Sequence, residues 1–204
     1  VTVGRELFSL GAVILGGAYE SGTEDSVARI LEGINPSGLS MSIDDRPTDL
    51  SGIRPTIQRI DMRRAVLESR YRLDGVSIVC RVRALRNMPY ALMSEVEVTA
   101  ERDVGMVFSN RHVVPSGFAD TLRESRTVVC EDGSRLLLQR TSGSYNAGHD
   151  RIVASSTFLC GAGCEQIAPG VVKVALHRGE RTSFALVGTV CTTAAFTHPW
   201  DETG

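Results

Sequence analysis

The stretch GVSIVCRVRAL, residues 75–85, decides the fold because its side chains alternate between apolar and polar. Polar Ser77, Arg81 and Arg83 share one parity. The alternate positions between them are apolar: Val76, Ile78, Cys80, Val82 and Ala84. A period of two residues is typical of a β-strand with one buried face and one solvated face. The sequence therefore predicts a strand here, with its apolar parity turned toward a core.

The same alternation continues on either side of this strand. Residues 93–101 (MSEVEVTAE) place Val96 and Val98 opposite Glu95, Glu97 and Thr99. Further strands are predicted in residues 38–50, 151–159 and 170–190, the last with a turn at 178–180. Residues 125–141 (SRTVVCEDGSRLLLQRT) predict a hairpin, because the turn dipeptide Asp132-Gly133 separates two apolar runs.

Three segments are less regular. Residues 56–75 favour a strand, since Arg59, Asp61 and Arg63 share one parity. Residues 23–33 (TEDSVARILEG) predict the one clear helix, with Thr23 as N-cap and Gly33 closing it. Residues 110–125 predict a long crossover or functional loop. Together these patterns predict an all-β protein: a large antiparallel sandwich with one or two short helices.

The composition excludes several function classes. The formal net charge of −2 over 204 residues does not favour binding to nucleic acid or anionic lipid. No apolar run reaches the roughly 18 residues of a membrane-spanning helix. Five cysteines without regular spacing argue against a secreted disulfide framework. We therefore expect a cytoplasmic protein that binds neither nucleic acid nor membrane and needs no cofactor.

The segment CGAGC, residues 160–164, is the one cysteine pattern that stands out. Its two thiols could bind a metal, form a disulfide or take part in redox chemistry. There is no second cysteine pair, and no histidine lies at zinc-site spacing. A glycine-rich hairpin tip is therefore the favoured interpretation, and the chemical role of Cys160 and Cys164 stays open.

The candidate binding residues are Asn110, Arg111 and His112, at the start of the expected loop. They combine hydrogen-bond donors, a cation and a ring that titrates near neutral pH. Of the other histidines, His149 follows Tyr145 in a loop that could bind a sugar, and His177 is expected at the surface beside a turn. No catalytic residue and no metal ligand is predicted.

Six stretches then occur in a familiar order. They are GAVILGGAYE (11–20), INPSGLSMSIDDRPTDL (34–50), QRIDMRRAVLESRYRL (58–73), EVEVTAERD (95–103), LQRTSGSYNAG (138–148) and GERTSFALVGTVCTTAAFTHP (179–199). In this order they resemble the N-terminal domain of glycoside hydrolase family 65, the maltose, trehalose and kojibiose phosphorylases and related hydrolases. The resemblance covers most of the chain.

The resemblance implies a galactose mutarotase-like super-sandwich joined to an (α/α)6 barrel, which holds the general-acid glutamate of the family. Helical periodicity is nearly missing from this sequence, so the barrel is not part of it. We expect a sandwich domain over residues 1–195 and a linker-like tail over 196–204, either in an excised domain or in a protein with this domain alone. The implied partners are an α-glucoside, bound by the full-length enzyme, the missing barrel and a second copy in a homodimer.

Two classes of function remain open. The first is a non-catalytic domain that supports the barrel and dimerisation. The second is a self-sufficient sugar-active sandwich of the aldose epimerase type, or a carbohydrate-binding module. An epimerase needs a histidine beside a carboxylate in a pocket, through His112 or His177. The low aromatic content of 5% weakens a binding module, because sugars stack on aromatic rings.

Overall fold

The computed structural model describes residues 13–19, 30–49, 53–85, 87–88, 90–145 and 151–192, and the regular structure in these ranges is all β-strand. The strands are β1 Val13–Tyr19, β2 Ile30–Gly33, β3 Asn35–Ile43, β4 Arg46–Pro47, β5 Ile57–Asp61, β6 Val66–Leu73, β7 Val76–Ala84, β8 Ala91–Ala100, β9 Val104–Val113, β10 Asp120–Val129, β11 Arg135–Ser144, β12 Ile152–Cys160, β13 Cys164–Ala168, β14 Val171–Leu176 and β15 Arg181–Thr192. Within these ranges no helix is long and apolar enough to cross a membrane. The all-β prediction is confirmed.

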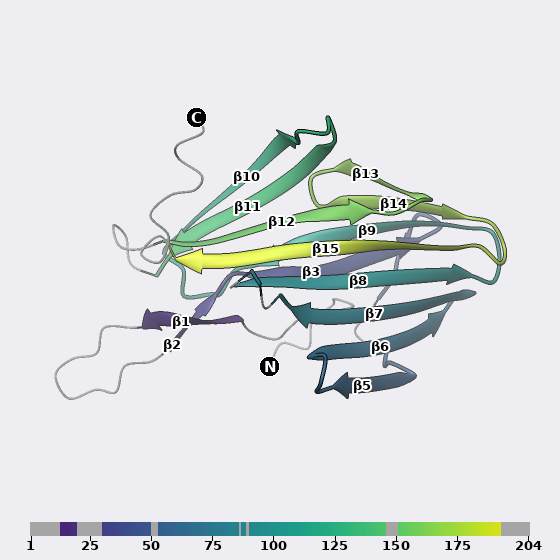
Figure 1. Ribbon diagram of the computed structural model, residues 1–204, viewed down its shortest axis with the longest axis horizontal. Coiled ribbons are helices and arrows are strands. Elements are labelled where there is room, and N and C mark those ends of the chain that lie inside the picture. The colour runs from purple at the N-terminus through teal and green to yellow at the C-terminus, as the bar shows by residue number, and fades with distance from the viewer. Residues whose placement is uncertain are drawn as a thin grey trace.

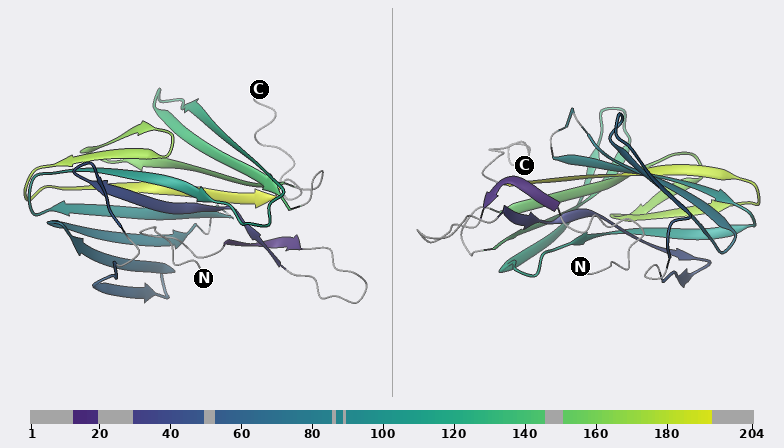
Figure 2. Two further views of the ribbon diagram at one scale, coloured as in Figure 1. Left: turned by 180° about the vertical axis from the view of Figure 1, so that it is seen from behind. Right: turned by 90° about the horizontal axis from the view of Figure 1, so that it is seen from below.

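Two antiparallel sheets form the sandwich. The larger has eight strands in the order β10-β11-β12-β15-β8-β7-β6-β5, and the smaller has five in the order β13-β14-β9-β3-β4. A separate pair is formed by β1 and β2. Figure 1 shows the smaller sheet behind the middle of the larger one, and Figure 2 shows it in front when seen from behind. The larger sheet therefore has an inner face toward its partner and an outer face away from it.

The stretch that predicted the fold forms strand β7, which lies inside the larger sheet between β8 and β6. A two-residue turn at Asp74 and Gly75, both with positive φ, joins β6 to β7 and sets their register, in which Glu68 lies opposite Arg81. Gly75 suits this turn because the absence of a Cβ makes positive φ accessible without strain. In β7 the apolar parity faces inward: Val76, Ile78 and Cys80 are buried, while Val82 is half-buried.

The core lies between the two sheets. Phe184 of β15 stacks near Phe108 of β9, with ring centroids 4.8 Å apart, and near Phe158 of β12 at 5.6 Å. Buried side chains of β3, β9 and β14 meet those of β6, β7, β8, β12 and β15 around these rings. Val96 and Val98, predicted to face the core, are fully buried. Burial of this apolar surface is the main term that holds the sheets together.

Strand β3 carries an irregularity where it passes the larger sheet. Its register with β9 shifts between Asn35 and Gly38, which is the pattern of a β-bulge around Pro36. A Cβ placed on Gly188 of β15 would lie 2.9 Å from the Pro36 ring. Glycine at position 188 therefore makes room for the bulge, and the two sheets approach closely here.

One prediction about local structure was right in type but missed a turn, and another was wrong. Residues 56–75 form two strands, β5 and β6, because the chain turns between them; Asp61 accepts hydrogen bonds from the backbone N–H groups of Arg63 and Arg64, and Ala65 has a φ of 52°. The expected loop over 110–125 is mostly strand, since β9 extends to Val113 and β10 begins at Asp120. The link between them does cross from one sheet to the other.

The predicted helix over residues 23–33 is contradicted at its end, where Ile30–Gly33 pair with β1 as strand β2. Two apolar residues, Ile30 and Leu31, shortly before Gly33 are compatible with the end of a helix or with a short strand, and here the pairing with β1 makes them a strand. Residues 23–29 lie outside the described part of the chain. So do His149 and the linker-like tail at 196–204, so the predicted domain boundary stays a prediction.

Candidate functional site

A buried cluster of neutral polar side chains contains two of the predicted binding residues. We call it the inner network; its members are Asn110 and His112 of β9, Gln139 and Thr141 of β11, and Ser156 of β12. It bridges the smaller sheet to the larger one through side chains that point between them. Asn110 and His112 are 7% and 2% exposed, and Thr141 and Ser156 are buried with them, while Gln139 at the margin is half-buried.

Asn110 uses its whole hydrogen-bonding capacity inside the fold. Its amide nitrogen donates to the backbone oxygens of Pro36 at 2.8 Å and Gly38 at 2.7 Å. Its Oδ1 accepts from the Ser156 hydroxyl at 2.6 Å and from the Gln139 amide. The two carbonyls belong to the bulge in β3, where the regular ladder cannot satisfy them. Asn110 therefore fixes the bulge rather than presenting free polar atoms.

The hydrogen bonds of His112 have a fixed direction. The only proton of the Ser156 hydroxyl goes to Asn110, so this oxygen must accept from His112 Nε2, 2.8 Å away. His112 Nδ1 then accepts from the Thr141 hydroxyl at 2.9 Å. In this arrangement the ring is neutral with its proton on Nε2, and the lowered pKa of His112 supports it. Burial lowers its pKa from 6.5 to about 4, and the nearby charge of Arg123 adds to the shift.

Arg111 does not join this cluster. It lies on the opposite face of β9 and is exposed, because neighbouring residues of a strand point in opposite directions. The structure therefore brings Asn110 and His112 together and leaves Arg111 apart. Binding by these three residues stays a prediction, and its most accessible member is Arg111.

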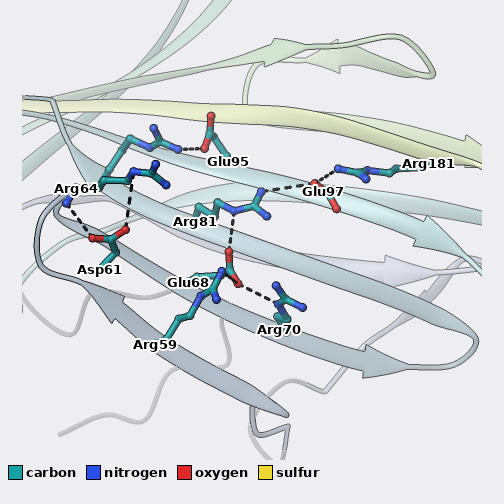
Figure 3. A network of polar contacts seen from close by, with 10 residues as sticks. Arg59, Asp61, Arg64, Glu68, Arg70, Arg81, Glu95, Glu97 and Arg181 are labelled. Atoms are coloured by element: carbon teal, nitrogen blue, oxygen red, sulfur yellow. Dashed lines mark hydrogen bonds and ion pairs between the residues drawn. The ribbon is translucent and has the colours of Figure 1, made fainter.

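A second polar array crosses the outer face of the larger sheet. We call it the outer ladder; its members are Arg59 of β5, Glu68 and Arg70 of β6, Arg81 of β7, Glu97 of β8 and Arg181 of β15. Figure 3 shows the alternating charges joined across five adjacent strands. Beside it, Arg83 pairs with Glu95. Cross-strand pairs of opposite charge stabilise a sheet and fix its register.

Glu68 is the centre of the outer ladder. Its carboxylate contacts Arg59 at 3.0 Å, Arg70 at 3.0 Å and Arg81 at 2.9 Å, and its side chain is 6% exposed. Burial alone would raise the pKa of Glu68, but hydrogen bonds from the three arginines outweigh it and lower the pKa. The cover consists of arginine side chains, a thin polar layer rather than a protein interior. Glu68 is held ionised.

One histidine does lie beside a carboxylate. His177 Nδ1 is 3.6 Å from Asp103 Oδ2, and their side chains are 82% and 75% exposed. Asp103 also accepts the backbone N–H of Arg178, which is the main reason that its pKa is lowered. The pair joins two turns at the end of the sandwich. His177 is therefore at the surface, as predicted, and its partner Asp103 is a solvated ion rather than a group in a pocket.

A cleft of about 620 Å³ opens at the end of the sandwich near the β3–β4 turn. Its lining residues are Ile43, Asp44, Arg46, Pro47, Thr48, Asp49, Asp74 and Arg102. The Asp44 carboxylate is already bound by the backbone N–H of Gly105 at 3.0 Å and by Arg102 at 2.7 Å. These contacts fix the turn and pair the charges of Asp44 and Arg102 with each other.

The cysteines of CGAGC do not sit at a hairpin tip. Cys160 ends β12 in the larger sheet and Cys164 begins β13 in the smaller one, so the segment crosses between sheets. Both thiols are free. Burial, with the neighbouring Cys164 thiol, raises the pKa of Cys160 to about 11. Within the described ranges no three His, Cys, Asp or Glu residues are grouped to hold a metal ion.

Comparisons with known proteins find similar proteins among kojibiose hydrolases. No family model matches the chain. A kojibiose hydrolase from Mucilaginibacter mallensis is 24% identical and covers 97% of this chain, and another from Flavobacterium johnsoniae is 22% identical and covers 93%. The chain spans only 31% and 30% of these relatives. The resemblance seen in the sequence is confirmed: the chain is similar to a part of much longer kojibiose hydrolases.

A solved structure agrees at the level of fold. A putative kojibiose phosphorylase from the human microbiome superposes with a TM-score of 0.55 over 97% of this chain and 26% of its own. The sequences are 9% identical, so this likeness shows the fold alone. The predicted large antiparallel sandwich is therefore one that also occurs inside a larger enzyme.

The outer ladder was missed by sequence reasoning, although a pattern that could have found it was present. The predicted strand at 75–85 and the turn dipeptide Asp74-Gly75 together imply that Glu68 faces Arg81 across the hairpin. The step from β7 to β8, where Arg81 lies opposite Glu95 and forms a diagonal ion pair with Glu97, depends on a register that no short turn sets. That part needed the structure.

Proposed function

We propose that this chain is the N-terminal β-sandwich domain of a family 65-like enzyme acting on α-glucosides. It is non-catalytic, supports an (α/α)6 catalytic barrel and contributes to a homodimer. The observation that carries this proposal is the difference in length. Kojibiose hydrolases match almost the whole chain, yet the chain spans less than a third of each. A region that forms a sandwich on its own within such an enzyme acts as a scaffold for the remainder.

The carboxylates of the outer face support a non-catalytic role. Glycoside hydrolysis needs a protonated carboxylic acid and a second carboxylate across the sugar. Here Glu68, Glu95 and Glu97 are each bound by arginine, and the pKa of Glu68 is lowered rather than raised. A carboxylate in such surroundings holds its negative charge and is a poor proton donor. These groups stabilise the sheet.

The aromatic side chains also favour a scaffold over a sugar-binding module. Phe108, Phe158 and Phe184 are in the core. Among the described residues, Tyr90 is the large aromatic side chain with substantial exposure, at 45%. A single exposed ring does not make the flat platform on which pyranose rings stack. Binding of free glucosides by this chain is therefore expected to be weak.

The first experiment tests catalysis. Purified chain is incubated with kojibiose, maltose and trehalose, with and without inorganic phosphate, and released glucose and glucose phosphate are measured. We expect no turnover above a mock preparation. Turnover that disappears when a residue of this chain is mutated would overturn the non-catalytic assignment.

The second experiment tests the supporting role. The matching region of the Mucilaginibacter mallensis kojibiose hydrolase is deleted, or replaced by this chain. The deletion should leave an insoluble or inactive protein, and the replacement should recover soluble protein with kojibiose hydrolysis. As a control, an unrelated β-sandwich of similar size is inserted instead. Full activity of the deleted enzyme would rule out a supporting role for this region.

A further inference from the structure

Strand β10 is the longest edge of the sandwich that no described strand covers. It spans Asp120–Val129 at the margin of the larger sheet and pairs only with β11 (Figure 1). Nearly all of its residues are exposed, including Leu122 at 52% and Val129 at 64%. The other edges, β5, β13 and β4, are five residues or shorter. A long open edge is a template for another strand.

The sequence of β10 shows what kind of strand fits. Glu124 and Arg126 carry opposite charges and lie two residues apart on the same face, the outer one that also holds the partner of Glu124, Arg140. Leu122 and Val128 flank them on that face. In an antiparallel pair of two copies, residues equally far from the two-fold axis face each other. An axis through Ser125 then places Glu124 opposite Arg126 and Leu122 opposite Val128.

Other axes are less favourable. The two-fold axis must lie level with a residue and not between two residues. Only then do residues of the outer face pair with residues of the outer face, because a shift of one residue in the pairing exchanges the faces. An axis through Arg123, Glu124 or Arg126 sets that charged residue directly against its own copy. Like charges directly opposite each other destabilise a sheet. Only the axis at Ser125, within this central part of the strand, pairs opposite charges twice.

We propose that a second copy of this chain pairs with β10 through this register and joins the two larger sheets into one continuous sheet. The inference rests on the homodimer within the proposed function and adds its location. Glu124 lies 3.9 Å from Arg140 of β11, so in the dimer it gains Arg126 of the second copy on its other side. Mixed charges on the edge thus select one register, and wrong registers are repelled. The contact is small, so the dimer is reversible and depends on concentration.

Charge reversal gives a direct test by sedimentation velocity over a range of protein concentrations. Glu124→Arg sets arginine against arginine at both pairs, and Arg126→Glu sets glutamate against glutamate. Each variant alone should be monomeric where the parent chain dimerises. An equal mixture of the two variants should dimerise again, because every pair is then of opposite charge. The double variant Glu124→Arg with Arg126→Glu should dimerise as well.

The results that would overturn the proposal are equally specific. A parent chain that stays monomeric at all concentrations excludes it, as does a dimer that both single variants leave intact. Recovery in the mixture separates pairing from misfolding, because a misfolded variant cannot be rescued by another. A monomeric chain would also remove the homodimer from the proposed function. It would leave the supporting role intact, which the replacement experiment tests separately.

A cross-link tests the register itself. Ser125→Cys brings two cysteines together at the axis, where Cα atoms of paired strands lie roughly 4.5–5.5 Å apart, within the span of a disulfide. Mild oxidation should give a covalent dimer whose peptide map joins residue 125 to its copy. Thr121→Cys is the matched control, because in this register it faces Val129 and not itself. Equal cross-linking of both variants would contradict the register.

Discussion

The inner network and the outer ladder are both polar, but they differ in charge and in depth within the sandwich. The inner network bridges the two sheets with neutral groups, and each of its protons has a defined acceptor. The outer ladder crosses one sheet with full charges, four arginines against two glutamates. One is sealed between layers, and the other is covered by its own arginine side chains (Figure 3).

The difference shows that burial determines whether a polar side chain can be charged. Removing an ion from water costs several kcal/mol, so a polar group between the sheets is stable only when it is neutral and fully hydrogen-bonded. At the outer face water still reaches the arginines, so the arginines and glutamates of the outer ladder can stay charged. The inner network should therefore be sensitive to any unpaired group, whereas the outer ladder should tolerate losses at its ends.

The largest effect is expected from Asn110→Ala. The substitution removes both donors to the bulge carbonyls of Pro36 and Gly38, and the acceptor of Ser156. Each buried group left without a partner costs about 1–3 kcal/mol, and partial relaxation brings the expected loss to about 4 kcal/mol. Urea unfolding measures it. Arg111→Ala, next to it on the exposed face, is the control and should change stability by less than about 0.5 kcal/mol. Equal losses would show that the inner network is not a unit of stability.

The next effect is a pH dependence that belongs to His112. Its folded pKa of about 4 lies below the unfolded value of 6.5, so the unfolded chain takes up the proton first as the pH falls. Stability from this residue is complete above pH 6.5 and is lost progressively toward pH 4, by about 3 kcal/mol. Unfolding free energies measured from pH 7.5 to 4 should fall more steeply in the parent chain than in His112→Gln, which cannot titrate. Parallel profiles would contradict a neutral, buried ring.

These two residues also mark how far the sequence could lead. The alternation of apolar and polar residues predicted the strands and the buried faces of β7 and β8, because burial of one face produces a pattern within the strand's own sequence. The chemistry of the side chains singled out Asn110, Arg111 and His112 as candidate binding residues at the start of an expected loop. It did not reveal the surroundings of Asn110 and His112, because Thr141 and Ser156 reach them from strands far along the chain. Contacts of that kind depend on how the two sheets stack. The pairing proposed for the open edge of β10, by contrast, follows from its sequence once the strand order shows that β10 is at the margin of the sheet.

A smaller loss is expected at the centre of the outer ladder. Glu68→Gln keeps the shape of the side chain but leaves three arginines around a neutral group. We expect a loss of about 2 kcal/mol, below that of a deeply buried ion pair because the arginines can turn toward water. Added salt should reduce the loss by screening the repulsion. Glu95→Gln, which removes a single partner of Arg83, is the matched control and should cost less. A loss that does not respond to salt would point to packing rather than charge.

The smallest effect is expected at the end of the outer ladder, with Arg181→Ala. The Arg181 side chain is 64% exposed, and its partner Glu97 keeps a second contact with Arg81 at 3.5 Å. An exposed pair whose loss leaves the acidic partner satisfied contributes less than about 0.5 kcal/mol. A double-mutant cycle with Glu68→Gln sharpens the comparison with the inner network. If the outer ladder is a row of separate pairs, the two losses add within about 0.5 kcal/mol, since only Arg81 and Glu97 connect the two sites. A larger coupling would mean that the charges act as one network across the sheet, in the way expected of the inner network alone.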